Sequence, residues 1–211
     1  MISPLVNMYV LCKAKRLHLA LPEDWRNTLL RETEYCKVNR IKVIYSWIWD
    51  CGCTVPNASA TIPGVILVNA EWAALIALYP DREDIHDAFR LTMGHEMTHH
   101  EKDYFFIEPF SKASKFVYWV NEVHADFGGI VKVFDANAEQ GMSAMQFKKA
   151  CKGDRDKDGH SHPSWKRRIE FIGNYDFNRE LILKIAHITG CKNKELIQRV
   201  CEHFEEINLR R

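Results

Sequence analysis

The decapeptide MGHEMTHHEK, residues 93–102, contains the pattern H-E-x-x-H at His95–His99. On a helix, residues four apart lie on the same face with Cβ atoms about 5–6 Å apart, so the two imidazoles could occupy two corners of a tetrahedral metal site. The pattern alone does not decide this, because a chain with 10 histidines in 211 residues yields one such match by chance in roughly 3% of shuffled sequences. A metal centre needs a further ligand from another segment.

The residues around the pattern predict two long helices. Residues 84–102 form the first, with Asp84 as its N-cap. Its apolar face consists of residues at four-residue intervals, namely Ile85, Phe89, Met93 and Met97. The second covers about residues 114–134, and Gly128-Gly129 within it would either allow close packing against a neighbour or interrupt the helix.

The second helix supplies the missing ligand. Glu122 and Asp126, in NEVHADFGG, lie four residues apart and therefore share a helix face. We expect Glu122 to complete a His2Glu site, and Asp126 to accept a hydrogen bond from the distal nitrogen of one ligand histidine. Glu96 lies one position after His95, from where its carboxylate could reach a metal-bound water. The alternative is a chance motif beside a charged helix surface, and the two elements together favour the metal site.

Elsewhere the chain alternates short strand and helix patterns. A surface helix is predicted over 22–37, a strand over 41–49, and a strand over 61–69 in which Pro63-Gly64 precedes a short apolar run. Pro63 suits the start of an edge strand. A short helix over 71–79, a charged loop over 152–164 and two or three amphipathic C-terminal helices complete the pattern. We expect an α+β fold, mainly helical with a small sheet, in a single domain over residues 1–211.

Composition excludes several classes of function. The 29 basic and 28 acidic residues give a formal charge of +1, so nothing favours nucleic acid as a partner. Apolar runs are too short for a membrane span, and the N-terminus lacks the features of a signal peptide. The seven cysteines are expected to be free thiols in a reducing compartment, which predicts a cytoplasmic protein; a redox or metal role for the Cys51/Cys53 pair is the less favoured interpretation.

Taken in order, these motifs resemble those of zinc peptidases of the HtpX and CaaX-prenyl-protease type (peptidase family M forty-eight, gluzincins). The resemblance covers about residues 40–172, and the last 39 or so residues form the C-terminal helices outside it. Ser161 stands where threonine is usual, and the membrane helices of the best-known members have no counterpart. The matching residues are Pro56-Asn57-Ala58, Gly64 with the VILVN run, His95–His99, Glu122–Asp126, His162-Pro163 and Arg168-Ile169.

The resemblance implies a zincin-like fold and a mechanism. It implies one Zn²⁺ per chain, held by His95, His99 and Glu122. Glu96 would act as the general base on the attacking water. The histidine of the H-P element, His162, would stabilise the oxyanion. Arg168 would brace the site behind the ligands, beside Asp126.

The resemblance also implies how a protein or peptide substrate is bound. An edge strand beside the active-site helix would pair with an extended peptide, and we expect the strand GVILVN to be that edge. The residues expected to contact substrate are Asn57, Ala58, Val65 and Leu67.

Other interpretations stay open on the sequence. The chain could be a regulatory zinc peptidase that clears a repressor or another partner protein, or a binding module that keeps the zinc fold without turnover. His100 and His124 are expected to point away from the ligand face. The acidic loop Asp154–Asp158 resembles half of a calcium loop, but a solvated turn is the favoured interpretation. The oligomeric state is not predicted.

Overall fold

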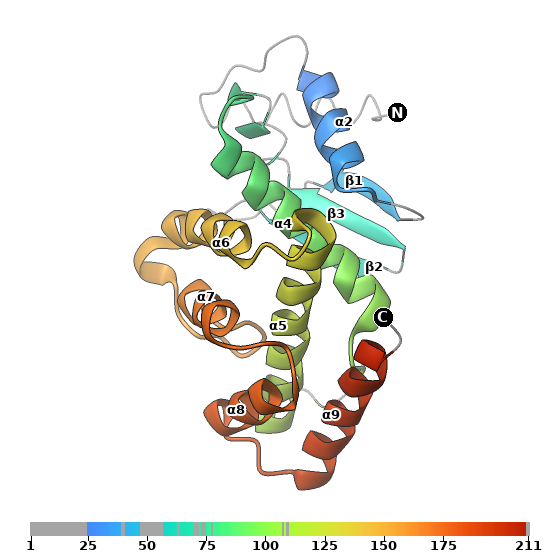
Figure 1. Ribbon diagram of the computed structural model, residues 1–211, viewed down its shortest axis with the longest axis vertical. Helices are drawn as coiled ribbons and strands as arrows, with labels where there is room; N and C mark the ends of the chain where they lie inside the picture. The colour runs from blue at the N-terminus through green and yellow to red at the C-terminus, as the bar shows by residue number, and fades with distance from the viewer. Residues whose placement is uncertain are drawn as a thin grey trace.

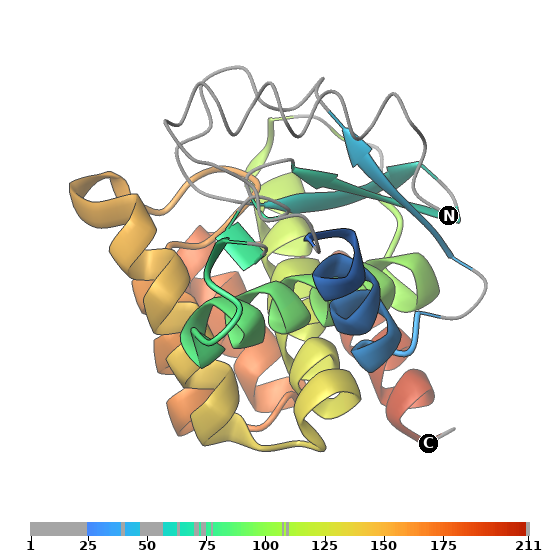
Figure 2. The same ribbon diagram turned by 90° about the horizontal axis from the view of Figure 1, so that it is seen from above.

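The computed structural model describes residues 25–38, 41–46, 57–62, 64–69, 72, 75–76, 78–106, 108 and 110–209. Most of these residues are helical, and a small sheet lies against one side of the helices (Figures 1 and 2). The predicted α+β class is therefore confirmed. Cys51 and Cys53 lie outside the described residues.

The sheet has three strands among the described residues. They are β1 (Lys42–Ser46), β2 (Ala58–Ile62) and β3 (Val65–Asn69), in the order β1-β3-β2. β3 pairs in parallel with β1 and antiparallel with β2. The central position therefore belongs to β3.

This order corrects the prediction that Val65–Asn69 is an edge strand. The residues before Gly64 form a strand of their own, β2, and the chain reverses at Gly64, whose φ of 70° is favourable for glycine. β2 then covers the side of β3 that was expected to be open. The strand was missed because its sequence, ASATI, is made of small and polar residues and lacks an apolar run. In the described part of the chain, β2 pairs only with β3, and it contacts the helix that carries His95–His99 more extensively than β3 does.

Two long helices cross behind the sheet. Helix α4 spans Glu83–Lys102 and α5 spans Lys112–Phe134, so both predictions are confirmed within two residues. Asp84 is not the N-cap of α4 as predicted: that position is Arg82, whose guanidinium donates two hydrogen bonds to Asp84 in the first turn. An acidic residue there still favours the helix, because it lies near the positive end of the helix dipole. Ser111 caps α5 in a capping box with Ser114.

Glycines bring α4 and α5 into backbone contact. A Cβ added to Gly94 would lie 2.9 Å from the carbonyl oxygen of Gly129, and one added to Gly129 would lie 2.9 Å from the backbone nitrogen of His95. A Cβ on Gly128 would lie 2.5 Å from the Thr98 side chain. The Gly128-Gly129 pair therefore serves close packing, and α5 continues through it without interruption.

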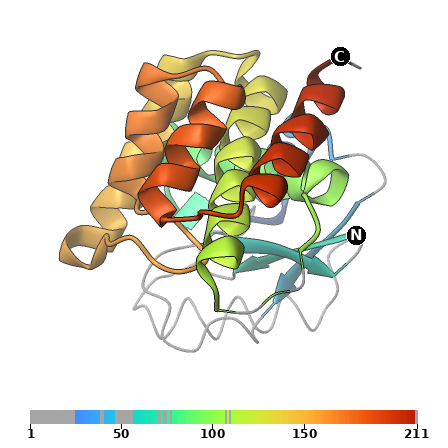
Figure 3. The ribbon, with the colours of Figure 1, turned by 90° about the horizontal axis from the view of Figure 1, so that it is seen from below.

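The remaining helices surround this pair. Figure 3 shows the C-terminal helices on the side of the molecule away from the sheet. Helix α6 was not predicted, although Asn137 caps it by accepting a hydrogen bond from the backbone of Gln140. No helix in the described part of the chain is both long and apolar enough to cross a membrane. The bounds are α2 Trp25–Tyr35, α6 Ala138–Lys152, the 3-10 turn η2 Gly153–Arg155, α7 Trp165–Asn174, α8 Arg179–Thr189 and α9 Lys194–Leu209.

Apolar side chains form two clusters. One lies between the sheet, α4 and α6 and contains Trp72, Phe89 and Met145. The other lies between α5, α8 and α9 and includes Trp119. Phe127 of α5 packs against both clusters. Helices α4 and α5 are thus supported from both sides, which limits how far their side chains can move relative to each other.

We predict that Gly129→Ala lowers the free energy of unfolding by about 1–3 kcal/mol, the usual cost of overpacking. The added methyl group would meet backbone atoms of α4, which cannot move aside without separating the helices. Urea unfolding followed by circular dichroism measures the effect. Gly173→Ala is the matched control, because its methyl group would meet only the flexible end of Met142. Equal stability of the two variants would contradict the prediction.

Candidate metal centre

The contact between α4 and α5 brings three potential ligands together. His95 and His99 lie one turn apart on α4, and Glu122 faces them from α5. The two Nε2 atoms are 2.9 Å apart, and they lie 3.4 Å (His95) and 3.6 Å (His99) from the nearer oxygens of Glu122. The structure therefore assembles the predicted metal-ligand set.

Asp126 and Arg168 hold His95 in its orientation. The Nδ1 of His95 donates to Asp126 Oδ1 at 2.9 Å, as predicted, which leaves Nε2 directed toward Glu122. Arg168, from α7, donates to Asp126 Oδ2 at 2.7 Å and contacts Oδ1 as well. Burial raises the pKa of Asp126, but the Arg168 charge outweighs it and holds that pKa below its ordinary value. Asp126 is therefore a carboxylate that only accepts hydrogen bonds.

Asp103 holds His99 in its orientation, and the sequence analysis did not predict this role for Asp103. The Nδ1 of His99 lies 2.8 Å from Oδ1 of Asp103, the residue that follows the last turn of α4. The four-residue spacing from His99 to Asp103 was the available signal, because it places both on one helix face. Both ligand histidines are thus oriented by carboxylates on their distal nitrogens.

The charges of the site suit a cation. Glu122 is 9% exposed, and burial alone would raise its pKa. The neighbouring histidines outweigh burial and hold the pKa of Glu122 well below its ordinary value, so the residue is an anion. Its Oε2 accepts no hydrogen bond within the described residues despite being buried.

The geometry fits a tetrahedrally coordinated metal ion. Ligands about 2.1 Å from such an ion lie about 3.4 Å from one another, and the three distances here scatter around this value. A metal ion would also satisfy the buried Glu122 Oε2, which otherwise has no hydrogen-bond partner among the described residues. The donor set of two imidazoles and one carboxylate therefore forms a candidate metal site.

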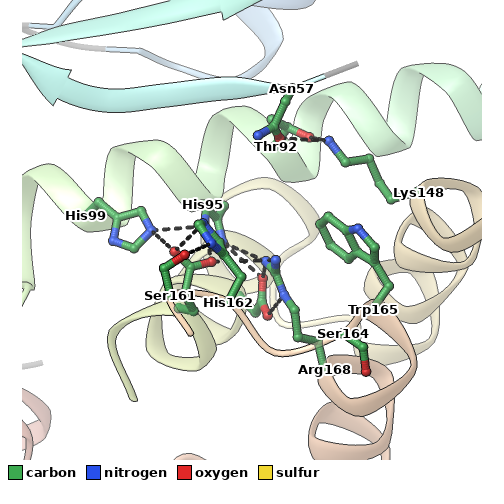
Figure 4. Close-up of polar contacts among 12 residues, drawn as sticks. Asn57, Thr92, His95, His99, Lys148, Ser161, His162, Ser164, Trp165 and Arg168 are labelled. Carbon is green, nitrogen blue, oxygen red and sulfur yellow. Dashed lines mark hydrogen bonds and ion pairs between the residues drawn. The ribbon is translucent and has the colours of Figure 1, made fainter. Parts of the chain in front are cut away.

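Two further predicted residues line the same site. Glu96 is buried and lines the cleft beside His95. His162 reaches the cleft from the loop before α7, with its Nε2 3.2 Å from Glu122 Oε1. Ser161 lies 2.7 Å from the other ring nitrogen of His162, and Figure 4 shows these side chains grouped around the ligand histidines.

A cleft of about 910 Å³ runs between β2 and α4 and contains the metal-ligand set. Of the predicted substrate-binding residues, Asn57, Ala58 and Leu67 line it. Val65 does not line it; its carbonyl accepts a hydrogen bond from His100 of α4. The volume is at the upper end of the range of about 300–1,000 Å³ for ligand sites, so the cleft is large enough for several residues of a peptide.

Lys148 of α6 also lines the cleft, and sequence reasoning missed it along with its helix. It is 2% exposed, and its Nζ donates to Asn57 Oδ1 (3.1 Å) and Thr92 Oγ1 (3.3 Å). Burial, followed by the Arg168 charge, lowers the pKa of Lys148 to about 7. No local sequence signal distinguishes this buried lysine from the neighbouring Lys149 and Lys152, which are not buried.

The remaining candidates have structural roles. His100 joins α4 to β3 through the bond described above, and His124 packs against Phe177. In the acidic loop, Asp156 accepts two backbone N–H bonds at the start of α7, and Asp158 accepts one from the backbone of Ser164. These carboxylates satisfy backbone N–H groups at the start of α7.

Comparisons of this chain with protein-family models, with curated proteins and with solved structures found no match.

We predict that Glu122→Ala loses most of its affinity for a divalent metal, measured with Zn²⁺ as the probe by calorimetry. The substitution removes the only carboxylate of the triad and leaves two imidazoles. Glu170→Ala, which changes an exposed glutamate of α7, is the control and should bind Zn²⁺ like the unmodified protein. Unchanged affinity in Glu122→Ala would remove this residue from the ligand set.

Proposed function

We propose that this protein is a zinc-dependent endopeptidase that hydrolyses peptide bonds in protein or peptide substrates. The observation that carries the proposal is the His95, His99 and Glu122 triad with the Glu96 carboxylate in the same cleft. Two histidines and one glutamate that leave a coordination position open are typical of hydrolytic zinc sites, whereas structural sites are closed. The sequence resemblance to gluzincin peptidases supports the same conclusion.

Glu96 is the proton carrier in this proposal. Zinc at the triad would supply a Lewis acid that polarises the peptide carbonyl and makes a bound water more acidic. Glu96 accepts the proton of the attacking water and then donates it to the leaving nitrogen. In the described part of the chain, no side chain donates a hydrogen bond to the Glu96 carboxylate, so its oxygens are available as acceptors.

His162 is positioned to donate a hydrogen bond to the oxyanion. Its side chain is 60% exposed, so the ring can contact a substrate in the cleft. Ser161 engages its Nδ1, which directs Nε2 toward Glu122 and the ligand histidines. A donor at this place contributes mainly in the transition state, when the carbonyl oxygen becomes negative.

The substrate is proposed to lie along β2. An extended peptide can add to a strand at the edge of a sheet, and among the described residues β2 pairs only with β3. Residues 57–60 line the cleft opposite α4. This assigns to Ala58–Ile62 the role that was expected of Val65–Asn69. Backbone pairing would hold the peptide across the metal site without restricting its sequence.

We predict that Glu96→Gln retains the fold and zinc binding and loses hydrolysis by at least about 10²- to 10⁴-fold, because an amide cannot accept the water's proton. Cleavage of casein followed by mass spectrometry measures the loss, and calorimetry measures the zinc. Glu101→Gln, at an exposed position of the same helix, is the control and should retain turnover. Full activity of Glu96→Gln would refute the proposed function.

We predict that His162→Ala lowers kcat by about 10²- to 10³-fold with little change in KM or zinc content, which is the effect of removing one oxyanion donor. His187→Ala, an exposed histidine of α8, serves as the comparison and should have no effect. Loss of zinc in His162→Ala would mark His162 as a ligand, and unchanged kcat would leave it without a catalytic role.

A further inference from the structure

The segment that joins α6 to α7 separates its charges in space. Residues 152–158, KGDRDKD, contain three basic and three acidic residues and are neutral as a whole. All three basic residues are exposed and line the cleft that contains the metal-ligand set, whereas Asp156 is the one acidic residue of this segment that lines it. This wall of the cleft therefore presents mainly positive charge. We call its three cations, Lys152, Arg155 and Lys157, the basic rim.

The acidic side chains of the same segment are used within the fold. Asp156 accepts hydrogen bonds from two backbone N–H groups at the start of α7, at 2.8 and 3.0 Å. Asp158 accepts one more and forms an ion pair with Arg167. These bonds attach the segment to α7 and limit its freedom, which lowers the entropy that a ligand must overcome on binding. Neither aspartate is therefore placed to neutralise the basic rim.

The cations of the basic rim are available to a ligand. In the part of the chain that the structure describes, their side chains form no hydrogen bond or ion pair. The charged groups around the metal-ligand set differ in this respect, because Asp126 is paired with Arg168, and Asp103 with His99. The formal charge of the whole chain is only +1, so the positive charge of the basic rim is a local feature of the cleft. Such a local field favours a negatively charged ligand.

The basic rim begins to one side of the metal ligands. Lys148 of α6 contacts Thr92, which precedes Glu96 by one turn of α4, and Lys152 follows Lys148 by one turn of α6. Figure 4 shows Thr92 and Lys148 on the side of His95 away from His99. Acidic side chains that reach the rim would therefore belong to residues that flank the scissile bond.

The wall of the cleft formed by β2 carries no charge. It consists of residues 57–60, NASA, along which the substrate is proposed to lie. In an extended peptide, side chains that point to the same side are two residues apart, a distance of about 6.4–6.8 Å. Three cations distributed over a segment of seven residues can therefore meet more than one acidic side chain of the same peptide.

We propose that the basic rim is a recognition site for substrates in which aspartate and glutamate residues flank the scissile bond. The proposal rests on the proposed peptidase function. A peptide fits the rim better than a nucleic acid does, because the cations lie in the same cleft as the strand edge and not on a broadly basic face. One exposed ion pair changes an equilibrium constant by about 1.4- to 5-fold, so three together should favour an acidic peptide by about 3- to 100-fold.

The test begins with cleavage of a proteome-derived peptide library by the zinc-loaded protein. Mass spectrometry of the products should show aspartate and glutamate enriched on one side of the cleaved bonds. A well-cleaved acidic peptide is then compared with a matched peptide in which asparagine and glutamine replace these acidic residues. We expect kcat/KM to be about 3- to 100-fold higher for the acidic peptide, mainly through KM.

A triple variant tests whether the basic rim causes this preference. Lys152→Gln, Arg155→Gln and Lys157→Gln together remove three exposed charges, so the fold and the affinity for Zn²⁺ should be unchanged. The ratio of kcat/KM for the acidic and neutral peptides should fall to about 1. A preference that persists in this variant would overturn the proposal.

The matched control removes three exposed lysines that do not line the cleft. It combines Lys184→Gln, Lys192→Gln and Lys194→Gln and changes the net charge by the same amount. This variant should keep the wild-type ratio. An equal loss of preference in both triple variants would show that net charge, and not the basic rim, selects the substrate.

Ionic strength provides a second check on the physical cause. Because the basic rim is exposed, salt should screen its interaction with the substrate. Raising NaCl from about 0.05 M to about 0.5 M should lower the acidic-to-neutral ratio in the wild-type protein and leave it unchanged in the rim variant. A ratio that does not respond to salt in the wild-type protein would overturn the electrostatic origin of the preference.

Binding provides a readout that is independent of turnover. In Glu96→Gln, calorimetry should give a lower Kd for the acidic peptide than for the neutral one, and addition of the three rim substitutions should abolish the difference. Tighter rim-dependent binding of a single-stranded oligonucleotide of the same charge would overturn the choice of a peptide. Cleavage without an acidic preference would overturn the basic rim and leave the peptidase proposal intact. Absence of any cleavage by the wild-type protein would contradict the peptidase function and the recognition site that rests on it.

Discussion

The backbone contact between α4 and α5 is the constraint on which the site depends. Gly94 and Gly129 face each other so closely that a Cβ on either would lie within 3.0 Å of the other helix. Ligands from two helices can approach within 3.6 Å only if the helices themselves are this close, because His and Glu side chains have limited reach. The metal-ligand geometry is therefore a consequence of glycine packing as much as of the ligands.

Buried charges then connect this helix pair to the loop that carries His162. Arg168 reaches from α7 to Asp126, and Asp126 holds His95. The start of α7 is capped by Asp156, so the loop and the helix are joined by hydrogen bonds on both sides of His162. Removing Arg168 or Asp126 would leave the other as a buried charge without its partner, which is far more costly than losing a surface ion pair. The site and the fold are thus stabilised by the same interactions.

The sequence predicted the helix that carries H-E-x-x-H, the second helix and the three residues of the candidate metal site, because each depends on a short spacing along one segment. The prediction that Val65–Asn69 is the edge strand was wrong, because that segment has an apolar run and the strand that lies beside it, ASATI, has none. Sequence reasoning also missed α6 and Lys148, as a lysine in a helix is ordinarily exposed and only the packing of α6 against α4 buries it. Both failures concern contacts between segments that are distant in sequence.

Helical periodicity is sufficient to place His95 and His99 on one face and Glu122 and Asp126 on another, because a repeat of 3.6 residues per turn is a local property of the backbone. It also separates His100 from the ligand face. Local spacing cannot establish which strand borders the cleft or which cation lies inside it. A strand finds its hydrogen-bond partners, and a lysine its burial, from residues anywhere in the chain. Only the packed tertiary structure therefore placed β2, and not β3, at an edge of the sheet within the described residues, and placed Lys148 beside Thr92.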